Sequence, residues 1–187
     1  MRLFAALIPS EEALDELAEE LAEVRASWPG LRWMSRDLWH VTLAFYGEVD
    51  EVGHRLLLPG LERAADRPAL ELAFSGAGAF PRGGSRSRVL WAGIEGDLQA
   101  LSGLAGAVAE AGEAAGAEVD RYRAYHAHLT LARSRVPRDL RPLAERLSGF
   151  AGAPWTAGEI HLVLSHPGGG RRGLRYESLA NWPLRER

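Results

Sequence analysis

The segment from Trp39 to Gly47 constrains this chain more than any other, because its centre recurs between Ala127 and Arg133. Both copies read His-x-Thr-Leu inside an apolar run with the character of a β-strand. The two histidines lie 88 positions apart (128 minus 40) in a chain of 187 residues. This spacing favours a duplicated architecture in which each half contributes one copy of the motif.

The alternation of a strand predicts what each copy presents. Side chains at positions i and i+2 point to the same face, so His40 shares a face with Thr42, and His128 shares one with Thr130. The intervening residues of each copy are apolar and suit a core. Each motif therefore offers one apolar face to the interior and one imidazole-plus-hydroxyl face, for which we expect a phosphate.

Two histidines facing each other across a cleft suit a reaction that needs a base and an acid near neutral pH. Hydrolysis of a phosphodiester is such a reaction, because one imidazole can take a proton from water while the other protonates the departing oxygen on the opposite side of phosphorus. Thr42 and Thr130 are expected to donate hydroxyl hydrogen bonds to phosphate oxygens. The scheme needs no metal and no cofactor.

The remaining periodicity predicts an α+β fold. The repeated motif suggests two lobes, and several connections are too short for parallel crossovers, so the sheets are expected to be mainly antiparallel. Residues 1–187 are expected to form a single bilobal domain with one motif per lobe, at 40–43 and 128–131. Pro59 is expected to kink or split the helix in which it lies. Strands are expected over 3–7, 31–34, 38–46, 70–74, 88–94, 127–133, 159–165 and 174–179, and helices over 10–28, 50–66, 97–115 and 138–147.

Composition excludes several classes of protein. The absence of cysteine excludes disulfide scaffolds, thiolate metal sites and cysteine nucleophiles. The net charge of −3 gives no global attraction for nucleic acid, although every basic side chain other than histidine is an arginine. No segment suggests a signal peptide or a membrane span, so we expect a cytoplasmic protein. Nothing implies a protein partner, and a monomer is expected.

The two motifs, HVTL at 40–43 and HLTLAR at 128–133, resemble those of the 2H phosphoesterase superfamily, also called 2'-5' RNA ligases, and in particular its bacterial RNA 2',3'-cyclic phosphodiesterases. Supporting segments run through most of the chain, among them Arg2 to Ala5 and Arg32-Trp33. The resemblance implies that a terminal 2',3'-cyclic phosphate of RNA, or of a small nucleotide, is opened to a 2'-phosphate without metal. It also implies that His40 is the proton donor and His128 the proton acceptor. The fold implied by the resemblance has two pseudo-symmetric lobes around a central cleft, each a mainly antiparallel sheet with helices on its outer face.

Two other functions stay open at this point. The same residues would serve 2'-5' RNA ligase activity by the reverse reaction, and a non-hydrolytic RNA-end binding protein would keep the cleft without turnover. The resemblance also implies a lysine where this chain has Ala44. Strict alternation places position 44 on the face of His40, so the cleft is expected to hold one positive charge fewer.

Further candidates surround the motifs. Alternation places Arg133 on the face opposite His128, so it reaches a phosphate only if the strand twists or ends there. The pair His126-x-His128 could be read as half of a metal site, but no partner ligands follow at useful spacing. An RNA-backbone role is one interpretation of Arg171 and Arg172. Four aromatic side chains could stack a base, although packing in the core is the better interpretation of each: Trp39, Phe45, Tyr125 and Trp155.

Overall fold

The computed structural model describes residues 1–83, 85–121, 123–168 and 173–187. Its strands form two antiparallel sheets, one with four strands in the order β3-β1-β8-β9 and one with five in the order β2-β6-β5-β4-β7. The strands are β1 (Arg2–Leu7), β2 (Arg32–Trp33), β3 (Val41–Glu48), β4 (Leu70–Phe80), β5 (Ser87–Gly96), β6 (His128–Arg138), β7 (Trp155–Ala157), β8 (Glu159–His166) and β9 (Arg175–Pro183).

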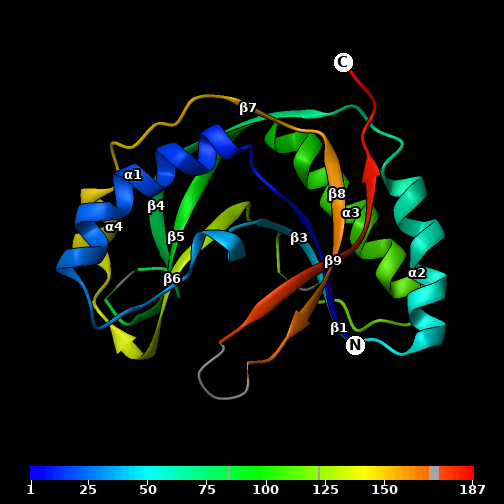
Figure 1. Cartoon of the computed structure of the whole chain (residues 1–187), viewed down its shortest axis with the longest axis horizontal. Helices are drawn as coiled ribbons and strands as arrows, with labels where there is room; N and C mark the ends of the chain where they lie inside the picture. Colours follow the sequence, from blue (N-terminus) through cyan, green and yellow to red (C-terminus); the bar gives the residue numbers. More distant parts are fainter. Residues whose placement is uncertain (84, 122, 169–172) are drawn as a thin grey trace.

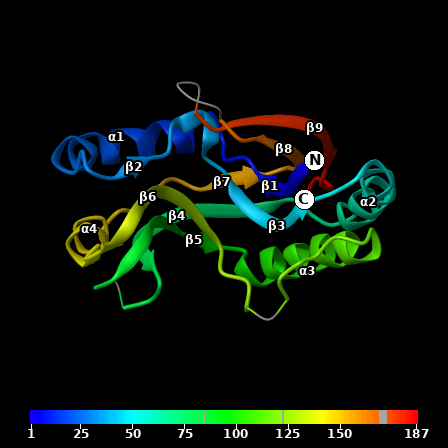
Figure 2. The ribbon, with the colours of Figure 1, turned by 90° about the horizontal axis from the view of Figure 1, so that it is seen from below.

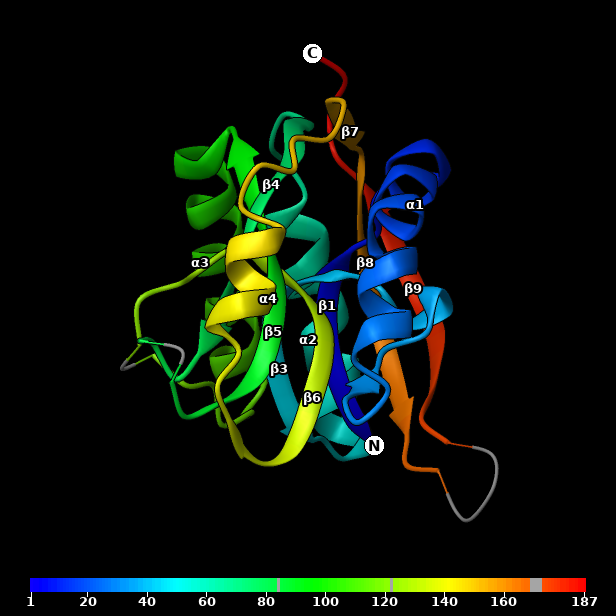
Figure 3. The ribbon, with the colours of Figure 1, turned by 90° about the vertical axis from the view of Figure 1, so that its left-hand side faces the viewer.

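The helices gather in two pairs at opposite ends of the molecule. Helices α1 and α4 lie at one end of the long axis, and α2 and α3 lie at the other (Figures 1 and 2). Seen along that axis, α4 lies in front of the strands β5 and β6 (Figure 3). The helices are α1 (Glu11–Ser27), η1 (Arg36–Leu38, a short 3-10 helix), α2 (Glu51–Ala64), α3 (Leu98–Ala114) and α4 (Arg141–Arg146).

The two halves exchange helices. Helix α1 follows β1 of the four-stranded sheet and leads into β2 at the edge of the five-stranded sheet, and it packs against β4 of the five-stranded sheet. Helix α3 connects β5 to β6 of the five-stranded sheet, yet it packs against β3. Because each sheet is covered by a helix from the opposite half, one contiguous hydrophobic core runs through both sheets. This exchange fixes the two motif strands relative to each other.

Local sequence explains where the first helices begin and end. The Ser10 hydroxyl accepts a hydrogen bond from the Ala13 amide at 3.2 Å, which caps α1 as its sequence predicts. The prediction of a broken second helix was wrong, since α2 continues through Pro59. Pro59 lies on the exposed face, so the Arg55 carbonyl that loses its partner can be hydrated, while Leu57 and Leu61 stay fully buried.

Several strands are longer than their local sequence predicts, among them β4, β6 and β9, the last of which extends to Pro183. The glycine-rich end of β4 pairs with β5 as far as Phe80, opposite Val89. Gly78 permits this pairing, because a Cβ there would collide with the ring of Trp91. Strand β6 continues to Arg138, past the start of the helix expected there. The short strand β7 was not predicted. Within the described residues, no helix is both long and apolar enough to cross a membrane.

Candidate active site

The two motifs line one cleft, which consists of two adjoining cavities. The small cavity, of about 440 Å³, receives His40, and the large cavity, of about 1110 Å³, extends toward the loop that precedes β6. Both volumes match or slightly exceed those of pockets that hold small molecules. The side chains that line both cavities are Thr42, Phe45, His128, Thr130 and Arg133. The structure thus brings together the four motif residues that the sequence predicts.

His40 is held by its neighbours in a fixed orientation. Its Nδ1–H donates to the Leu38 carbonyl at 2.8 Å, and its Nε2 lies 2.9 Å from the Thr42 hydroxyl. The rings of Phe4 and Tyr176 pack against the imidazole at centroid distances of 4.7 and 5.4 Å. Because a carbonyl only accepts hydrogen bonds, the neutral ring carries its proton on Nδ1 and presents Nε2 as an acceptor. The hydrogen bond to Thr42 confirms that this pair shares a face.

His128 repeats this arrangement in the other sheet. Its Nδ1–H donates to the carbonyl of His126 at 2.7 Å, again two residues before the histidine. The rings of Phe80 and Trp91 contact it at centroid distances of 5.0 and 6.1 Å. Unlike Thr42, Thr130 makes no hydrogen bond through its hydroxyl to any other described residue. Both imidazoles therefore expose Nε2 for proton transfer, and the Thr130 hydroxyl is available to a ligand.

A β-bulge follows each threonine and reverses the alternation of the strand. Thr42 and Ala44 pair with adjacent residues of β1, so Leu43 between them has no partner in that strand. In the same way, Thr130 and Ala132 pair with adjacent residues of β5, and Leu131 between them has no partner. The residue after each threonine and the next one are consequently both buried. The equivalence of the two bulges shows that the duplication extends beyond the motif.

The bulges determine the outcome of two predictions that assumed a strict alternation of side chains along the strand. Arg133 lies on the cleft side with His128, so the strand irregularity that the sequence analysis required for it is present. The expected placement of Ala44 on the strand face of His40 was wrong, although Ala44 does line the large cavity of the cleft. Ala44 pairs with Ala5, is 7% exposed and belongs to the main core. Phe45 takes the place equivalent to Arg133 and is 44% exposed toward both cavities.

The remaining aromatic candidates divide into two groups. Tyr125 lines the large cavity, but its hydroxyl donates to the Thr42 carbonyl at 2.8 Å. It therefore links the segment before the second motif to the strand of the first. Trp39 and Trp155 are each 3% exposed and pack in the core. Of the four aromatic residues, only Phe45 and Tyr125 face the cleft.

Replacing Tyr125 with phenylalanine is expected to lower the free energy of unfolding by about 1 kcal/mol, because one partly buried hydrogen bond between the two halves is lost. Urea unfolding followed by circular dichroism would measure the change. Tyr46→Phe is a matched comparison, since the Tyr46 hydroxyl donates to the Val108 carbonyl of the helix that packs on its own strand. A Tyr125→Phe protein as stable as the wild type would contradict the role of this link.

Burial weakens the basicity of both motif histidines. Desolvation lowers the pKa of His40 to about 4, and the positive charges of a protonated His128 and of Arg133 act in the same direction, against the Leu38 carbonyl, which raises it. Desolvation also lowers the pKa of His128, against the hydrogen bond to the His126 carbonyl, which raises it, while the charges of a protonated His126 and of Arg133 lower it further. Both imidazoles are therefore neutral in the unliganded protein at pH 7, and a bound phosphate anion would favour their protonation.

Acid is expected to destabilise the wild type more than the His40→Gln variant. The His40 imidazole takes up a proton near pH 6.5 when unfolded but only near pH 4 when folded, so the unfolded state binds more protons between these values. Stability is therefore lost as the pH falls through this window. At about 1.4 kcal/mol per pKa unit, the His40 contribution reaches at most about 3 kcal/mol. Urea unfolding at both ends of the window would measure it; an equal loss in both proteins would contradict it.

Several candidate groups do not form part of this arrangement. His126 lies 5.9 Å from His128 between ring centroids, but within the described ranges no group of three or more histidines and acidic residues could hold a metal ion. Arg171 and Arg172 lie outside the described residues.

The cleft also receives side chains that were not predicted to line it, namely Arg2, Arg32 and Tyr176. Arg2 and Arg32 lie in two of the segments that carry the family resemblance, and this resemblance could have indicated that they line the cleft.

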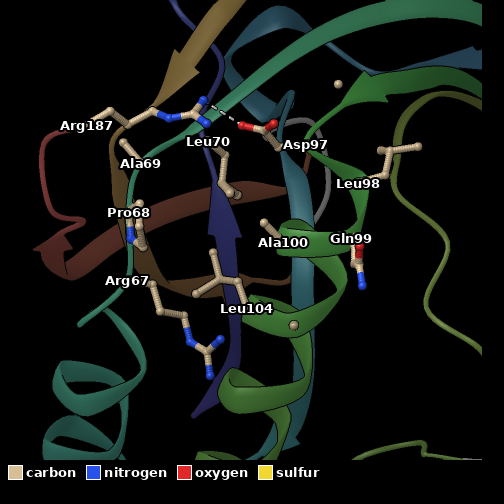
Figure 4. A pocket seen from close by; sticks show the side chains of 12 residues that line it. Arg67, Pro68, Ala69, Leu70, Asp97, Leu98, Gln99, Ala100, Leu104 and Arg187 are labelled. Carbon is tan, nitrogen blue, oxygen red and sulfur yellow. Dashed lines mark hydrogen bonds and ion pairs between the residues drawn. The ribbon is translucent and has the colours of Figure 1, made fainter.

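A third cavity, of about 650 Å³, lies away from the motifs, between the start of β4 and helix α3 (Figure 4). At its edge the Arg187 guanidinium forms an ion pair with Asp97 at 2.8 Å. No histidine and none of the predicted site residues lines it. This cavity therefore contains none of the side chains for which the sequence predicts chemistry.

Two antiparallel sheets that each bring a His-x-Thr strand to a shared cleft define the 2H phosphoesterase class of fold. Comparison with known sequences places the chain within it. The sequence model of the 2'-5' RNA ligase superfamily matches residues 13–169, and the chain belongs to this family.

Individual relatives and solved structures agree with this assignment. The chain is 29% identical over 185 residues to an RNA 2',3'-cyclic phosphodiesterase of Geobacillus stearothermophilus, a match that covers 97% of this chain and 56% of that protein. It is 31% identical over 133 residues to an RNA 2',3'-cyclic phosphodiesterase of Archaeoglobus fulgidus, covering 71% and 72% of the two chains. The chain thus spans little more than half the length of the first relative.

Among solved structures, the protein TT0787 of Thermus thermophilus superimposes with a TM-score of 0.79 at 29% identity, covering 100% of this chain and 99% of that one. Escherichia coli LigT in complex with 3'-AMP superimposes with a TM-score of 0.74 at 27% identity, covering 98% and 97%. These matches extend over the whole fold, including both motif strands.

Proposed function

We propose that this protein hydrolyses the terminal 2',3'-cyclic phosphodiester of RNA to a 2'-phosphomonoester by metal-independent acid–base catalysis with two histidines. One observation carries the proposal. Each motif histidine donates Nδ1–H to the carbonyl two residues before it, which leaves two Nε2 atoms and two threonines lining one cavity. The names of the Geobacillus and Archaeoglobus relatives and the 3'-AMP held by LigT support a nucleotide phosphate as the ligand.

The proposed step is an in-line displacement at phosphorus. His128 Nε2 takes a proton from water as its oxygen forms a bond to phosphorus, and the bond from phosphorus to the 3'-oxygen breaks on the opposite side. His40 delivers its Nε2 proton to that 3'-oxygen, so the phosphate remains on the 2'-oxygen. The hydroxyls of Thr42 and Thr130 donate to the non-bridging oxygens, where negative charge increases in the transition state.

The environments of the two histidines support this division of roles. His40 acts as the acid, as the family resemblance implies, and its low pKa makes it a strong proton donor once the phosphate has brought it into the protonated form. In the unliganded protein the Thr42 hydroxyl donates to Nε2 of the neutral His40 ring, and in the proposed step it donates to the phosphate instead. His128 has no such hydroxyl on Nε2, so this nitrogen is available to a water molecule.

The pH dependence of kcat/KM is expected to be bell-shaped, with its maximum between about 4 and 6.5. One imidazole must be protonated and the other neutral, and kcat/KM reports the pKa values of the free enzyme, both of which burial lowers from 6.5. Activity should therefore fall on both sides of a mildly acidic maximum. Initial rates at low substrate concentration would define the profile, and a curve that rises monotonically to alkaline pH would contradict the paired roles.

A single incubation tests the function. An oligonucleotide ending in a 2',3'-cyclic phosphate is incubated with the protein in EDTA, together with an RNA that has a free 5'-hydroxyl, and the products are identified by phosphorus NMR and mass spectrometry. We expect a 2'-phosphate, unaffected by the chelator. A 3'-phosphate would contradict the assignment, a 2'-5' joined product would reveal the ligase reaction, and tight binding without turnover would indicate an RNA-end binding protein.

A further inference from the structure

Three arginines from three different strands line the small cavity beside the motif residues. Arg2 comes from β1, Arg32 from β2 and Arg133 from β6. Burial raises the pKa of the Tyr176 hydroxyl, and the positive charges of these three arginines act against that rise, as expected for cations around one oxygen. The Arg2 guanidinium also lies 5.2 Å from the centre of the Phe45 ring, an arrangement that orients it toward the cleft by a cation–π contact.

This arrangement is electrostatically unfavourable in the free protein. Arg32 and Arg133 are directly opposite each other in the β2–β6 pairing, and like charges in such cross-strand positions destabilise a sheet. None of the three forms an ion pair with any described carboxylate, and no aspartate or glutamate lines the small cavity. Some arginines elsewhere on the surface do form ion pairs with carboxylates, among them Arg36, Arg121, Arg141 and Arg185.

The lining of the large cavity contains acidic as well as basic side chains, unlike that of the small cavity. Glu118 and Asp120 line it together with its arginines. Arg121 pairs with carboxylates of α3, and Arg123 lies 3.8 Å from Asp120. Arg82 and Arg88 line the large cavity as well, so positive charge is present in both cavities. The small cavity differs because no acidic side chain lines it, on the side of the cleft where His40 lies.

We propose that Arg2 and Arg32, with Arg133, form a subsite for a second phosphate, the one that joins the terminal nucleotide to the rest of an RNA chain. The cleft then selects an oligonucleotide end over a free cyclic mononucleotide. This inference rests on the proposed function, because it assumes that the cyclic phosphate occupies the histidine–threonine site. The second phosphate supplies the negative charge that the cross-strand arginine pair lacks.

The test compares two substrates in the wild type and its variants. One substrate is a nucleoside 2',3'-cyclic phosphate without a 5'-phosphate, and the other is a dinucleotide with the same cyclic end. In the Arg32→Gln and Arg2→Gln variants, kcat/KM for the dinucleotide is expected to fall roughly 10- to 100-fold, the effect of losing a charged hydrogen bond. The loss for the mononucleotide should be at least tenfold smaller. Arg55→Gln, an exposed arginine on α2 that lines neither cavity, controls for net charge.

Stability separates a binding role from a structural one. Arg32→Gln is expected to keep or raise the Tm, because it removes the cross-strand repulsion with Arg133. Equal losses for both substrates, or no loss for the dinucleotide, would overturn the subsite. A lowered Tm together with equal losses would assign Arg32 a structural role instead.

Binding measurements keep the subsite testable without turnover. The wild type is expected to bind a dinucleotide 2'-phosphate at least tenfold more tightly than a nucleoside 2'-phosphate, and Arg32→Gln should abolish this difference. If the wild type hydrolyses neither cyclic substrate, the proposed function fails, and this comparison still decides whether the arginines recognise a second phosphate. Equal affinities in the wild type would contradict the subsite whatever the enzymatic outcome.

Discussion

Replacing His128 or His40 with alanine is expected to lower kcat by roughly 100- to 10,000-fold, the range attributable to one positioned acid or base. Both histidines line the small cavity, and each is oriented by a carbonyl two residues before it. Without His128, water must be deprotonated by solvent; without His40, the 3'-oxygen must leave unprotonated. Steady-state rates on an oligonucleotide with a 2',3'-cyclic phosphate would measure each loss.

The matched control is His54→Ala, since His54 lies on α2 and lines neither cavity of the cleft. Its variant should retain wild-type kcat, and circular dichroism should show that all the variants are folded. The double variant His40→Ala/His128→Ala is expected to be little slower than the slower single variant, because the two groups act in one concerted step. Turnover close to that of the wild type in either single variant would refute the two-histidine mechanism.

Substituting valine for Thr130 is expected to lower kcat by roughly 100-fold, with a smaller effect on substrate binding, because valine keeps the shape of threonine and removes only the hydroxyl. The Thr130 hydroxyl has no hydrogen-bond partner among the described residues, so the loss reports its contact with the phosphate. Thr130→Ser restores the hydroxyl and should recover most of the rate. Failure of serine to recover it would indicate that the methyl group, and not the hydroxyl, is what matters.

Thr42→Val is expected to have two effects, of which Thr130→Val has only one. The Thr42 hydroxyl lies 2.9 Å from His40 Nε2, so its removal frees the imidazole as well as removing a donor to the phosphate. Loss of a hydrogen bond to the neutral ring is expected to raise the pKa of His40. The acidic limb of the pH profile should therefore shift to higher pH in Thr42→Val but stay in place in Thr130→Val. Identical profiles in the two variants would contradict this asymmetry.

The pairing of the motifs was predictable because it depends on short-range features. A His-x-Thr-Leu repeat in two apolar strands identifies the histidines, the threonines and their common faces. Helix positions also followed from local signals, such as the cap at Ser10. Pro59 misled the prediction of α2, because whether a proline breaks a helix depends on which face it occupies, and burial of the opposite face is a tertiary property.

The bulges mark the limit of reasoning from alternation. Leu43 and Leu131 are inserted relative to the neighbouring strands, and nothing in their local sequence signals this. Each shifts the following residues by one position, which brings Phe45 and Arg133 to the face of the motif histidines and turns Ala44 to the opposite face of its strand. Side-chain alternation therefore predicts the face on which a residue lies only as far as the first bulge of its strand.

The sequence by itself determined which side chains carry the chemistry, because residue type and period-two spacing are properties of the chain. Only the tertiary structure decided how the surrounding groups converge. It linked Tyr125 to the Thr42 carbonyl 83 positions away, and it placed Arg32 opposite Arg133. Such contacts depend on strand register, bulges and the exchange of helices between the two sheets. These long-range packing relations leave no periodic pattern in the sequence.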